Sequence, residues 1–510
     1  MAGNNRKIRT GTELVRFSLV LAVFACSSAG IANDKIGSGN DFGAKAEKML
    51  NAQSLKYFGI RKSLQASASA TSGAYRTEGQ SATDQVLLAK GLKAEYVTRN
   101  AGNLTDMMVL WPQDKPTHLV TCVEGGREDI GLGKFNPSVQ RIDLQTGMVE
   151  TILRGMDRCD GISATAWNTI LATEETGDGT AFEIAHPLTT TENTVVDRVT
   201  GEISGATAEN IRHRPNLPIM AWEGLVVLES GVVFAGDELR PGTAQPDADG
   251  GAIYKFIPTT PWNGVSGIEN SPLASGSVYV MQVSCRGDRQ QFGQGCEVGK
   301  ANWVGPIDPL HARAEATVFQ ATGYYRPEDM HKDPLYAAPE GFDSATRFCW
   351  TNTGNEDAGN YGEVMCAVDL EPLTATVADG DSRLVEVNRF IEGDTDFNSF
   401  DNLAFQPVTG NLYVIEDHPN GDVFACLPDG ADRDIKSDGC IRILSVKDSS
   451  AEPTGFLFSN DGETAYVSIQ HSNDENMPEF DGYPTDDVLK ITGFRIKGSK
   501  FLHKNHERND

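Results

Sequence analysis

The sequence predicts an all-β fold, a six-bladed β-propeller with a short helical and extended arm at the N-terminus. Three observations predict it. Short runs of β-branched and aromatic residues alternate with clusters of Gly, Asp, Asn and Pro from about residue 104 onward. No long amphipathic helix interrupts these runs. A hairpin ending in acidic residues recurs, and such a hairpin buries both faces only when copies are stacked or arranged radially.

The expected strands are short and closely spaced. They are His118–Cys122, Thr169–Thr173, Leu225–Ala235, Ala252–Ile257, Ser277–Val283, Arg347–Trp350, Glu363–Val368, Asn411–Ile415, Ile441–Val446 and Thr464–Ile469. The chain has 52 glycines against 23 prolines, which suits many strands joined by tight turns. Six blades with insertions fit the region 104–497, and a sandwich or two-barrel protein is the alternative with the same pattern.

The recurring hairpin has three clear copies. Residues 224–238, 402–417 and 455–471 each contain a strand, a turn and a second strand, followed by polar or acidic residues. In a propeller, the strand ends of all blades converge on one central channel. Polar residues that lie far apart in the sequence are therefore expected to form one cluster there.

The segment before the propeller divides into three parts. Residues 1–32 predict a signal peptide, and 33–103 predict an arm and linker. Within the arm, Phe42 to Leu64 predicts a short helix followed by extended chain, and Gln65 to Thr83 predicts a loose linker. Residues 498–510 form a polar C-terminal tail.

The first 32 residues have the features of an export signal. Phe17 to Ala25 is an apolar run too short to span a bilayer, and small residues favour cleavage after Ala32. A lipoprotein signal with Cys26 as the lipidated residue fits less well, because Phe24 is bulky. A twin-arginine signal is also imperfect. The basic residues of this segment are Arg6, Lys7, Arg9 and Arg16.

The chain is strongly acidic, with a formal net charge of −27. Such a protein is repelled by nucleic acid and by anionic lipid, so neither is expected as a partner. No stretch after the signal is apolar enough for an integral membrane span. The acidic excess serves solubility, or it holds hard cations, since Ca²⁺ takes six to eight oxygen ligands. The oligomeric state does not follow from the sequence.

Nine cysteines are present, and eight remain after the signal. Export makes disulfides chemically feasible. Cys122 and Cys159 either pair with each other, or one of them is a metal ligand. The other six form three pairs that are close in sequence, each of which can clip a loop or hairpin: Cys285 with Cys296, Cys349 with Cys366, and Cys426 with Cys440.

Four segments carry residues suited to chemistry. The first comprises residues 157–161 and 167–175, where Glu174 and Glu175 end a strand. Both carboxylates can turn toward one cation there, although consecutive strand residues otherwise face opposite ways. Glu223 follows a Trp directly before an apolar strand. Arg326 lies two residues before Glu328, which can place a phosphate-binding guanidinium beside a metal-binding carboxylate. Each feature alone also fits an ordinary surface turn. The fourth segment is 451–455, with Gln470 and His471 ending the same hairpin.

In order and spacing, these segments resemble the PhoX-type alkaline phosphatase family over most of the chain after the signal. The matching positions are Phe58-Gly59-Ile60, Cys159, Trp167-Asn168-Thr169, Glu174-Glu175, Arg326-Pro327-Glu328, Phe400-Asp401-Asn402-Leu403, Glu452, Thr454, Gly455, Gln470 and His471. The chain departs from the family pattern at Asn168 and Thr173, which replace Gly and Cys, and in a longer spacer.

The resemblance implies a six-bladed propeller with Fe³⁺ and Ca²⁺ at one end of its channel. It implies that Cys159 and Glu223 bind iron, and that Arg326 holds the substrate phosphate. It also implies a small-molecule phosphate ester as substrate and a location outside the cytoplasm. The carboxylates shared between iron and calcium would be Glu174, Glu175, Glu328 and Glu452.

The implied chemistry is physically coherent. A phosphate monoester is a dianion, so its hydrolysis needs positive charge over the phosphoryl oxygens and an activated oxygen nucleophile. Two alternatives remain open. One is a calcium-dependent lactonase or esterase propeller without iron, which needs neither a thiolate nor a guanidinium clamp. The other is a metal-stabilised binding propeller without catalysis, which the departures at Asn168 and Thr173 allow.

Overall fold

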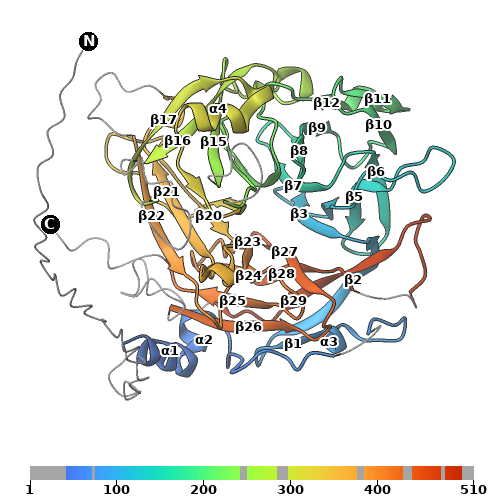
Figure 1. Cartoon of the computed structure of the whole chain (residues 1–510). Coiled ribbons are helices and arrows are strands. Elements are labelled where there is room, and N and C mark those ends of the chain that lie inside the picture. The colour runs from blue at the N-terminus through green and yellow to red at the C-terminus, as the bar shows by residue number, and fades with distance from the viewer. Residues whose placement is uncertain are drawn as a thin grey trace, which may run out of the picture. The chain divides into compact units, whose positions relative to one another are not determined.

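The structure is a computed structural model that describes residues 42–71, 75–241, 250–283, 297–375, 384–428, 439–472 and 477–496. The predicted signal peptide and C-terminal tail lie outside the described residues, as do Cys26, Cys285 and Cys296. The described part is mostly β-strand (Figure 1). None of its helices is long and apolar enough to cross a membrane.

The N-terminal segment forms helices and then contributes strands to the main fold. The expected short helix is present as α1 (Phe42–Ala52) and α2 (Ser54–Tyr57). Buried Leu50, Phe58 and Ile60 anchor this segment in a hydrophobic core with strands from the C-terminal part of the chain. Three further elements follow: α3 (Ala82–Gln85), β1 (Val86–Leu88) and β2 (Lys93–Gly102).

The first two sheets lie in the N-terminal half of the fold and follow the chain closely. One has the order β11-β10-β6-β5-β4-β3, and the next has the order β12-β9-β8-β7. The bounds of their strands are β3 (Thr105–Trp111), β4 (His118–Val123), β5 (Pro137–Asp143), β6 (Val149–Arg154), β7 (Cys159–Ala164), β8 (Thr169–Glu174), β9 (Ala181–Ala185), β10 (Asn193–Asp197), β11 (Glu202–Gly205) and β12 (Ile211–His213).

A ten-stranded sheet follows, with the order β13-β14-β15-β16-β17-β22-β21-β20-β19 and β18 paired to β15. Helix α4 (Ala312–Val318) connects two of its strands. The bounds are β13 (Trp222–Val227), β14 (Val233–Asp237), β15 (Gly251–Pro258), β16 (Gly276–Val283), β17 (Gly299–Ile307), β18 (Gly323–Tyr324), β19 (Pro327–Lys332), β20 (Thr346–Asn352), β21 (Glu363–Asp369) and β22 (Val385–Glu392).

The last two sheets each take one strand from the N-terminal segment. β1 pairs with β26, and β2 pairs with β29, so the N-terminus completes sheets built from the C-terminal part. The remaining bounds are β23 (Phe400–Phe405), β24 (Leu412–Glu416), β25 (Asp422–Cys426), β26 (Cys440–Val446), β27 (Glu452–Phe458), β28 (Thr464–Gln470) and β29 (Thr485–Thr492). Residues 86–88 and 93–102, which lie in the expected arm and linker, therefore supply strands to these two sheets.

One strand of each hairpin unit faces the centre of the fold. In the order β3, β7, β13, β19, β23 and β27, each of these inner strands contacts the next, and β27 contacts β3 (Figure 1). Strands β8, β14 and β24 are buried along their whole length. This is why the sequence shows continuous apolar runs rather than alternating ones.

The all-β, propeller-like part of the fold prediction is confirmed, whereas six separate sheets are not observed. The described strands form five sheets, because β17 pairs with β22 through Gly299–Ala301 and joins two sets of strands. Stacked Phe234 and Phe348, with ring centroids 4.3 Å apart, pack the two sets together. The core at this junction is therefore continuous.

The described residues contain three disulfides. Two were expected: Cys349–Cys366 joins β20 to β21, and Cys426–Cys440 joins β25 to β26. The third joins Cys122, on β4, to Cys159 at the start of β7, with their Cα atoms 5.1 Å apart. The expectation of a free Cys159 is therefore wrong. Adjacent strands of two neighbouring sheets bring the two thiols together although 37 residues separate them in sequence.

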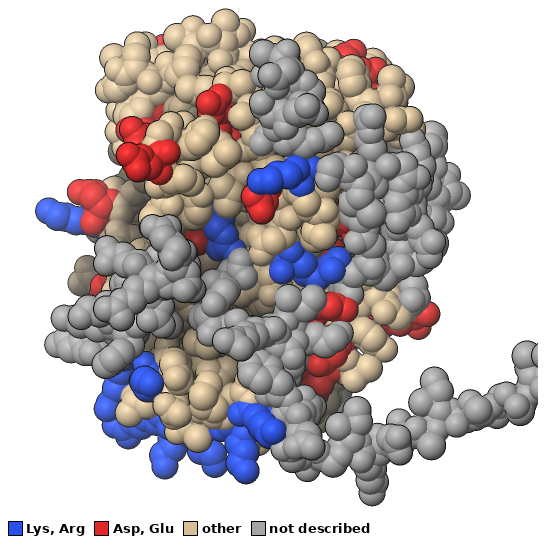
Figure 2. All heavy atoms as spheres, turned by 90° about the vertical axis from the view of Figure 1, so that its left-hand side faces the viewer, with Lys and Arg blue, Asp and Glu red and all other residues tan. Residues whose placement is uncertain are grey.

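Basic residues gather at one end of the described surface. Figure 2 shows Lys and Arg side chains at the lower edge of one face, at the level where Figure 1 places α1 and α2. Exposed Lys45, Lys48, Lys56, Arg61 and Lys62 belong to this segment. Among the described residues, several buried acids lie instead within the ring of inner strands.

Candidate metal centre

Each inner strand has an acidic residue within its first two positions. The acid is the second residue in five of these strands, and in β27 it is the first. The six residues are Asp106, Asp160, Glu223, Glu328, Asp401 and Glu452. Because the inner strands form a ring, residues spread over more than 300 positions of the sequence come to the same end of it.

A β-bulge accompanies every one of these acids. The pairing between the inner strand and the next strand is regular at the first residue and then shifts register, for example between Thr105 and Met108 and between Cys159 and Ile162. The same shift occurs in β13, β19, β23 and β27. A bulge bends the strand and redirects its side chains. In five units the acid lies within this shifted segment, whereas in β27 the shift follows Thr454, two residues after Glu452.

A second set of polar residues comes directly after the second strand of each unit. In five units, the backbone N–H of this residue donates a hydrogen bond to the carbonyl of the residue before the inner strand, at 2.7–3.2 Å. This bond holds the two strand ends together and fixes the side chain at the ring. The five residues are Glu124, Glu175, Glu238, Thr353 and Asp417, and His471 takes the same place in the sixth unit.

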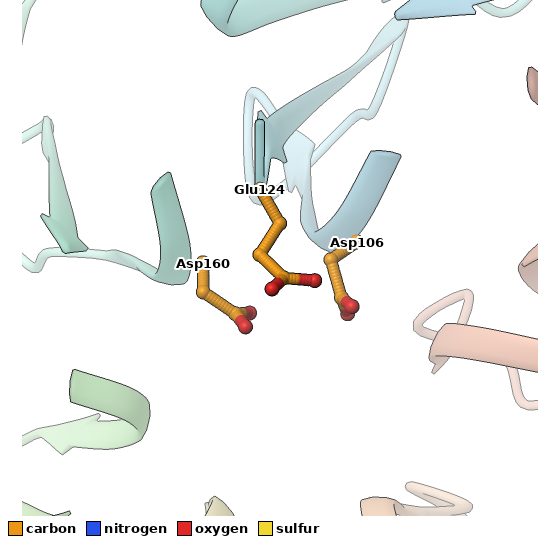
Figure 3. A group of neighbouring side chains, drawn as sticks. All are labelled: Asp106, Glu124 and Asp160. Carbon is orange, nitrogen blue, oxygen red and sulfur yellow. The ribbon is translucent and has the colours of Figure 1, made fainter. Parts of the chain in front are cut away.

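These side chains form three groups of carboxylates. In each group the possible ligand atoms lie within 4.8 Å of one another. Figure 3 shows one group, in which carboxylates from three strand ends point toward the same region. Glu223 belongs to both of the other groups. The groups are Asp106 with Glu124 and Asp160, Glu175 with Glu223 and Glu238, and Glu223 with Glu328 and Asp401.

Most carboxylates of these groups are buried, Glu124 and Glu238 are slightly exposed, and the pKa values of all of them are shifted by burial. Burial raises the pKa of Asp106 and of Glu124 to about 7, and that of Glu175 and of Glu328 to about 8. For Asp160, Glu223, Glu238 and Asp401, burial and then neighbouring carboxylates raise the pKa well above its usual range. Negative charges in such a place are unfavourable unless cations neutralise them.

The donor set fits hard cations. Oδ1 of Asp160 and Oε2 of Glu328 are buried and accept no hydrogen bond from any described residue. Buried polar atoms normally have a partner, so these two carboxylate oxygens are suited to act as cation ligands. Oxygen-only sites of this kind suit Ca²⁺ and other hard metal ions. They do not include a thiolate, because Cys159 is in a disulfide.

Two arginines lie among the carboxylates. Arg326 forms ion pairs with Glu238, with Glu328 at 2.8 Å and with Asp417 at 2.6 Å, and its side chain is 18% exposed. Although burial raises the pKa of Asp417, Arg326 holds it below its usual range. Arg158 forms ion pairs with Glu124 and, at 3.2 Å, with Glu175. The centre thus combines acidic groups with guanidinium donors, as a site for an anionic ligand and cations requires.

The structure brings most of the sequence-predicted site residues together. Glu175, Glu223 and Glu328 lie in the carboxylate groups. Glu452 lies at the same end of the ring, 3.0 Å from His471. Arg326 is at the centre, as expected. Metal binding by these residues stays a prediction.

Two expected ligands lie elsewhere. Glu174 faces away from Glu175, because consecutive strand residues point to opposite sides. It pairs with Arg198 at 2.8 Å and accepts hydrogen bonds from the backbone N–H groups of Asp157 and Thr180. Cys159 is bound to Cys122 and supplies no thiolate.

Six acids of the centre were not named from the sequence as ligands: Asp106, Glu124, Asp160, Glu238, Asp401 and Asp417. Four of them lie in segments whose pattern had drawn attention, namely Asp160, Glu238, Asp401 and Asp417. The position of these residues relative to the strands is the feature of the sequence that indicates them as ligands. An acid directly after a turn and at the start of an apolar strand recurs once per unit, as does a polar residue after the following strand.

The fold and the centre define an all-β, propeller-like protein with a buried polycarboxylate centre. Residues 230–473 match the family model described as alkaline phosphatase PhoX. Over this region the chain is therefore similar to the PhoX-type alkaline phosphatase family, which its motifs also resemble. The family comprises phosphoric monoester hydrolases, so the predicted class of enzyme is confirmed at the level of the family.

A solved structure supports the same fold. PhoX of Pseudomonas fluorescens in complex with vanadate, a transition state analogue, is 16% identical, with 85% of this chain and 98% of that chain covered and a TM-score of 0.54. A more distant match, a putative oxidoreductase (glucose dehydrogenase) of Thermus thermophilus, is 13% identical, with 79% and 100% covered and a TM-score of 0.39. No curated protein matches the chain.

Proposed function

We propose that this protein is a metal-dependent phosphomonoesterase that releases phosphate from small phosphate esters outside the cytoplasm. The observation that carries the proposal is Arg326, a guanidinium held within a ring of buried carboxylates. Cations held by the carboxylates, together with Arg326, would supply the positive charge that a phosphate dianion needs. The family match over residues 230–473 supports the same activity.

The metal ligands in this proposal are the acids of the three groups together with Glu452. Bound metal ions would act as Lewis acids on the phosphoryl oxygens and would lower the pKa of a bound water. The unpartnered oxygens of Asp160 and Glu328 support this assignment. Proton release should accompany metal binding, because several of these carboxyl groups have pKa values of about 7 to 8.

We retain iron together with calcium as the proposed metals, with a change in the ligands of iron. The disulfide of Cys159 removes the iron–thiolate bond that the resemblance implied. Iron would then be held by carboxylates alone, with Glu223 as the proposed ligand because it belongs to two groups. Fe³⁺ is a hard Lewis acid and accepts such ligands.

The role proposed for Arg326 is to bind the phosphoryl group. Its planar guanidinium can donate two parallel hydrogen bonds to phosphate, which a Lys ammonium cannot. Ion pairs with Glu238 and Asp417 hold its side chain in place. Pro327, which follows directly, restricts the backbone beside it. A preorganised donor of this kind stabilises charge that develops during phosphoryl transfer.

We also propose that the fold counts as six blades. Six inner strands carry the acid and the bulge, and two of the six units share the ten-stranded sheet through β17 and β22.

Export is proposed from the basic and apolar pattern of residues 1–32, and the three disulfides of the described residues are typical of exported proteins. Residues 33–103 remain the proposed arm, except for the strands that they supply.

A calcium-dependent esterase or lactonase propeller is the second candidate, favoured by the absence of a thiolate among the described residues of the centre. Purified protein loaded with Ca²⁺ and iron should hydrolyse p-nitrophenyl phosphate and should not open a simple γ-lactone. Hydrolysis of the lactone by protein that leaves the phosphate ester intact would favour the second candidate. Failure of the fully metallated protein on both substrates would favour a binding propeller.

A further inference from the structure

Arg158 occupies the same place in its unit as Arg326 does in another. Each is the residue directly before an inner strand, β7 for Arg158 and β19 for Arg326. Both have left-handed backbone conformations, with φ of 54° and 63°. The carbonyl of each accepts the bond that closes the strand ends, from Glu175 at 2.8 Å and from Thr353 at 3.2 Å. Two of the six units therefore carry an arginine at this position, directly before the inner strand.

The two guanidinium groups contact the two members of one carboxylate pair, Glu175 and Glu238. Nε and Nη2 of Arg158 donate to Oε2 of Glu175 at 3.3 and 3.2 Å. Nε of Arg326 donates to Glu238. Ligand atoms of Glu175 and Glu238 lie within 4.8 Å of each other. A ligand over this pair is therefore within reach of both arginines.

Arg158 differs from Arg326 in its exposure, whereas both arginines have one nitrogen that donates to no described residue, Nη1 in Arg158 and Nη2 in Arg326. The Arg158 side chain is 46% exposed, against 18% for Arg326. Its contacts use Nε and Nη2, and Nη1 donates to no described residue. An arginine that serves only as a counter-ion donates hydrogen bonds through more of its nitrogens. Arg198, which is 15% exposed, donates to Glu174 and Asp178 through all three of its nitrogens.

We propose that Arg158 is a second substrate-binding residue, which contacts the phosphoryl oxygens of the phosphate ester from the solvent side while Arg326 contacts them from the inner side. This inference rests on the proposed phosphomonoesterase function. Planar guanidinium groups match the oxygens of phosphate, and half-exposed Arg158 can meet the ester before it is enclosed. Arg158 should therefore act mainly on substrate binding, and Arg326 mainly on turnover.

The test compares Arg158→Ala and Arg158→Lys with the wild type at matched metal content. Binding of inorganic phosphate is measured by calorimetry, and hydrolysis of p-nitrophenyl phosphate by steady-state kinetics. We expect Arg158→Ala to raise both the Kd of phosphate and the KM of the ester by about tenfold or more, as for loss of one charge-assisted contact, with kcat changed by less than about threefold. Arg158→Lys should restore a part of the affinity. Arg212→Ala is the control, because Arg212 pairs with Glu269 at the surface.

The outcomes separate this inference from the proposed function. Unchanged phosphate affinity in Arg158→Ala, with an active wild type, overturns the role of Arg158. The role of Arg158 is also overturned if Arg158→Ala loses metal ions while each metal-loaded site binds phosphate with unchanged affinity. Arg158 would then serve only as a counter-ion to the carboxylates. Calorimetry needs no turnover. A wild type that hydrolyses no ester but binds phosphate, and binds it more weakly after Arg158→Ala, would sustain the contact and refute the phosphatase.

Discussion

Replacing Asp106 by Asn should stabilise the metal-free protein and weaken the metal-loaded one. Asp106 is buried at the start of β3, and it accepts hydrogen bonds from Thr454 and, at 2.9 Å, from Gln470. Without a cation, its negative charge lies close to those of Glu124 and Asp160. Asn has nearly the same shape and removes that charge. With a cation bound, the same change removes a ligand.

The magnitude follows from the pKa of Asp106, which burial raises from 3.8 to about 7. A group whose pKa is raised by folding lowers stability as the pH rises from its unfolded to its folded pKa. About three pKa units correspond to a ceiling of about 4 kcal/mol above pH 7. Neighbouring carboxyl groups take up protons in response, so we expect about 1–3 kcal/mol. The advantage of Asp106→Asn should vanish near pH 4.

The assay is urea unfolding of chelated and Ca²⁺-loaded protein between pH 4 and pH 8. We expect Asp106→Asn to lower the affinity of the centre for Ca²⁺ by about tenfold or more. Added Ca²⁺ should therefore stabilise the variant less than it stabilises the wild type. Glu363→Gln is the control. Glu363 accepts hydrogen bonds from Arg389 at 2.5 Å and Asn352 at 2.9 Å, so this change should cost about 3 kcal/mol with or without Ca²⁺. Equal stability of Asp106→Asn and wild type in all conditions would mean that the charge of Asp106 neither opposes folding nor helps to hold Ca²⁺.

Three further predictions concern the same centre. Arg326→Lys should keep the bound metals and lower kcat for an aryl phosphate by about 10²–10³-fold, and full activity at matched metal content would remove Arg326 from the phosphate site. In chelated protein, the melting temperature should fall as the pH rises from about 4 to about 8, because the pKa values of Glu175 and Glu328 are raised to about 8; a melting temperature that rises over this range would contradict it. Non-reducing peptide mapping should find Cys122 joined to Cys159, and replacing both by Ser should leave the metal content unchanged; a free, metal-bound Cys159 would reverse this assignment.

The strands were predictable because their apolar runs are bounded by turn residues. Nine of the ten expected runs each coincide with one described strand, for example Thr464–Ile469 with β28 and Glu363–Val368 with β21, and Leu225–Ala235 covers parts of β13 and β14 and the turn between them. The number of sheets was not predictable. The pairing of β17 with β22 depends on how two sets of strands meet in space, and no local pattern encodes it.

The centre was partly predictable for a related reason. Recurring acids at strand ends signalled a convergent site, and Glu175, Glu223 and Glu328 were found this way. Which other residues face the centre depends on the register of the strands. Glu174 and Glu175 are adjacent in sequence, yet only the exact strand end tells which of them faces the centre. The partner of Cys159 depends on contact between two sheets, which spacing in the sequence cannot give.

Metal content per chain is the most direct test of whether the buried carboxylates hold metal ions. Elemental analysis of purified protein, expressed with calcium and iron available, should find both metals bound. Glu223→Gln should lower the content most, because Glu223 belongs to two of the three groups, whereas Glu174→Gln should leave it unchanged. Folded wild-type protein that binds neither metal would contradict metal binding by these carboxylates.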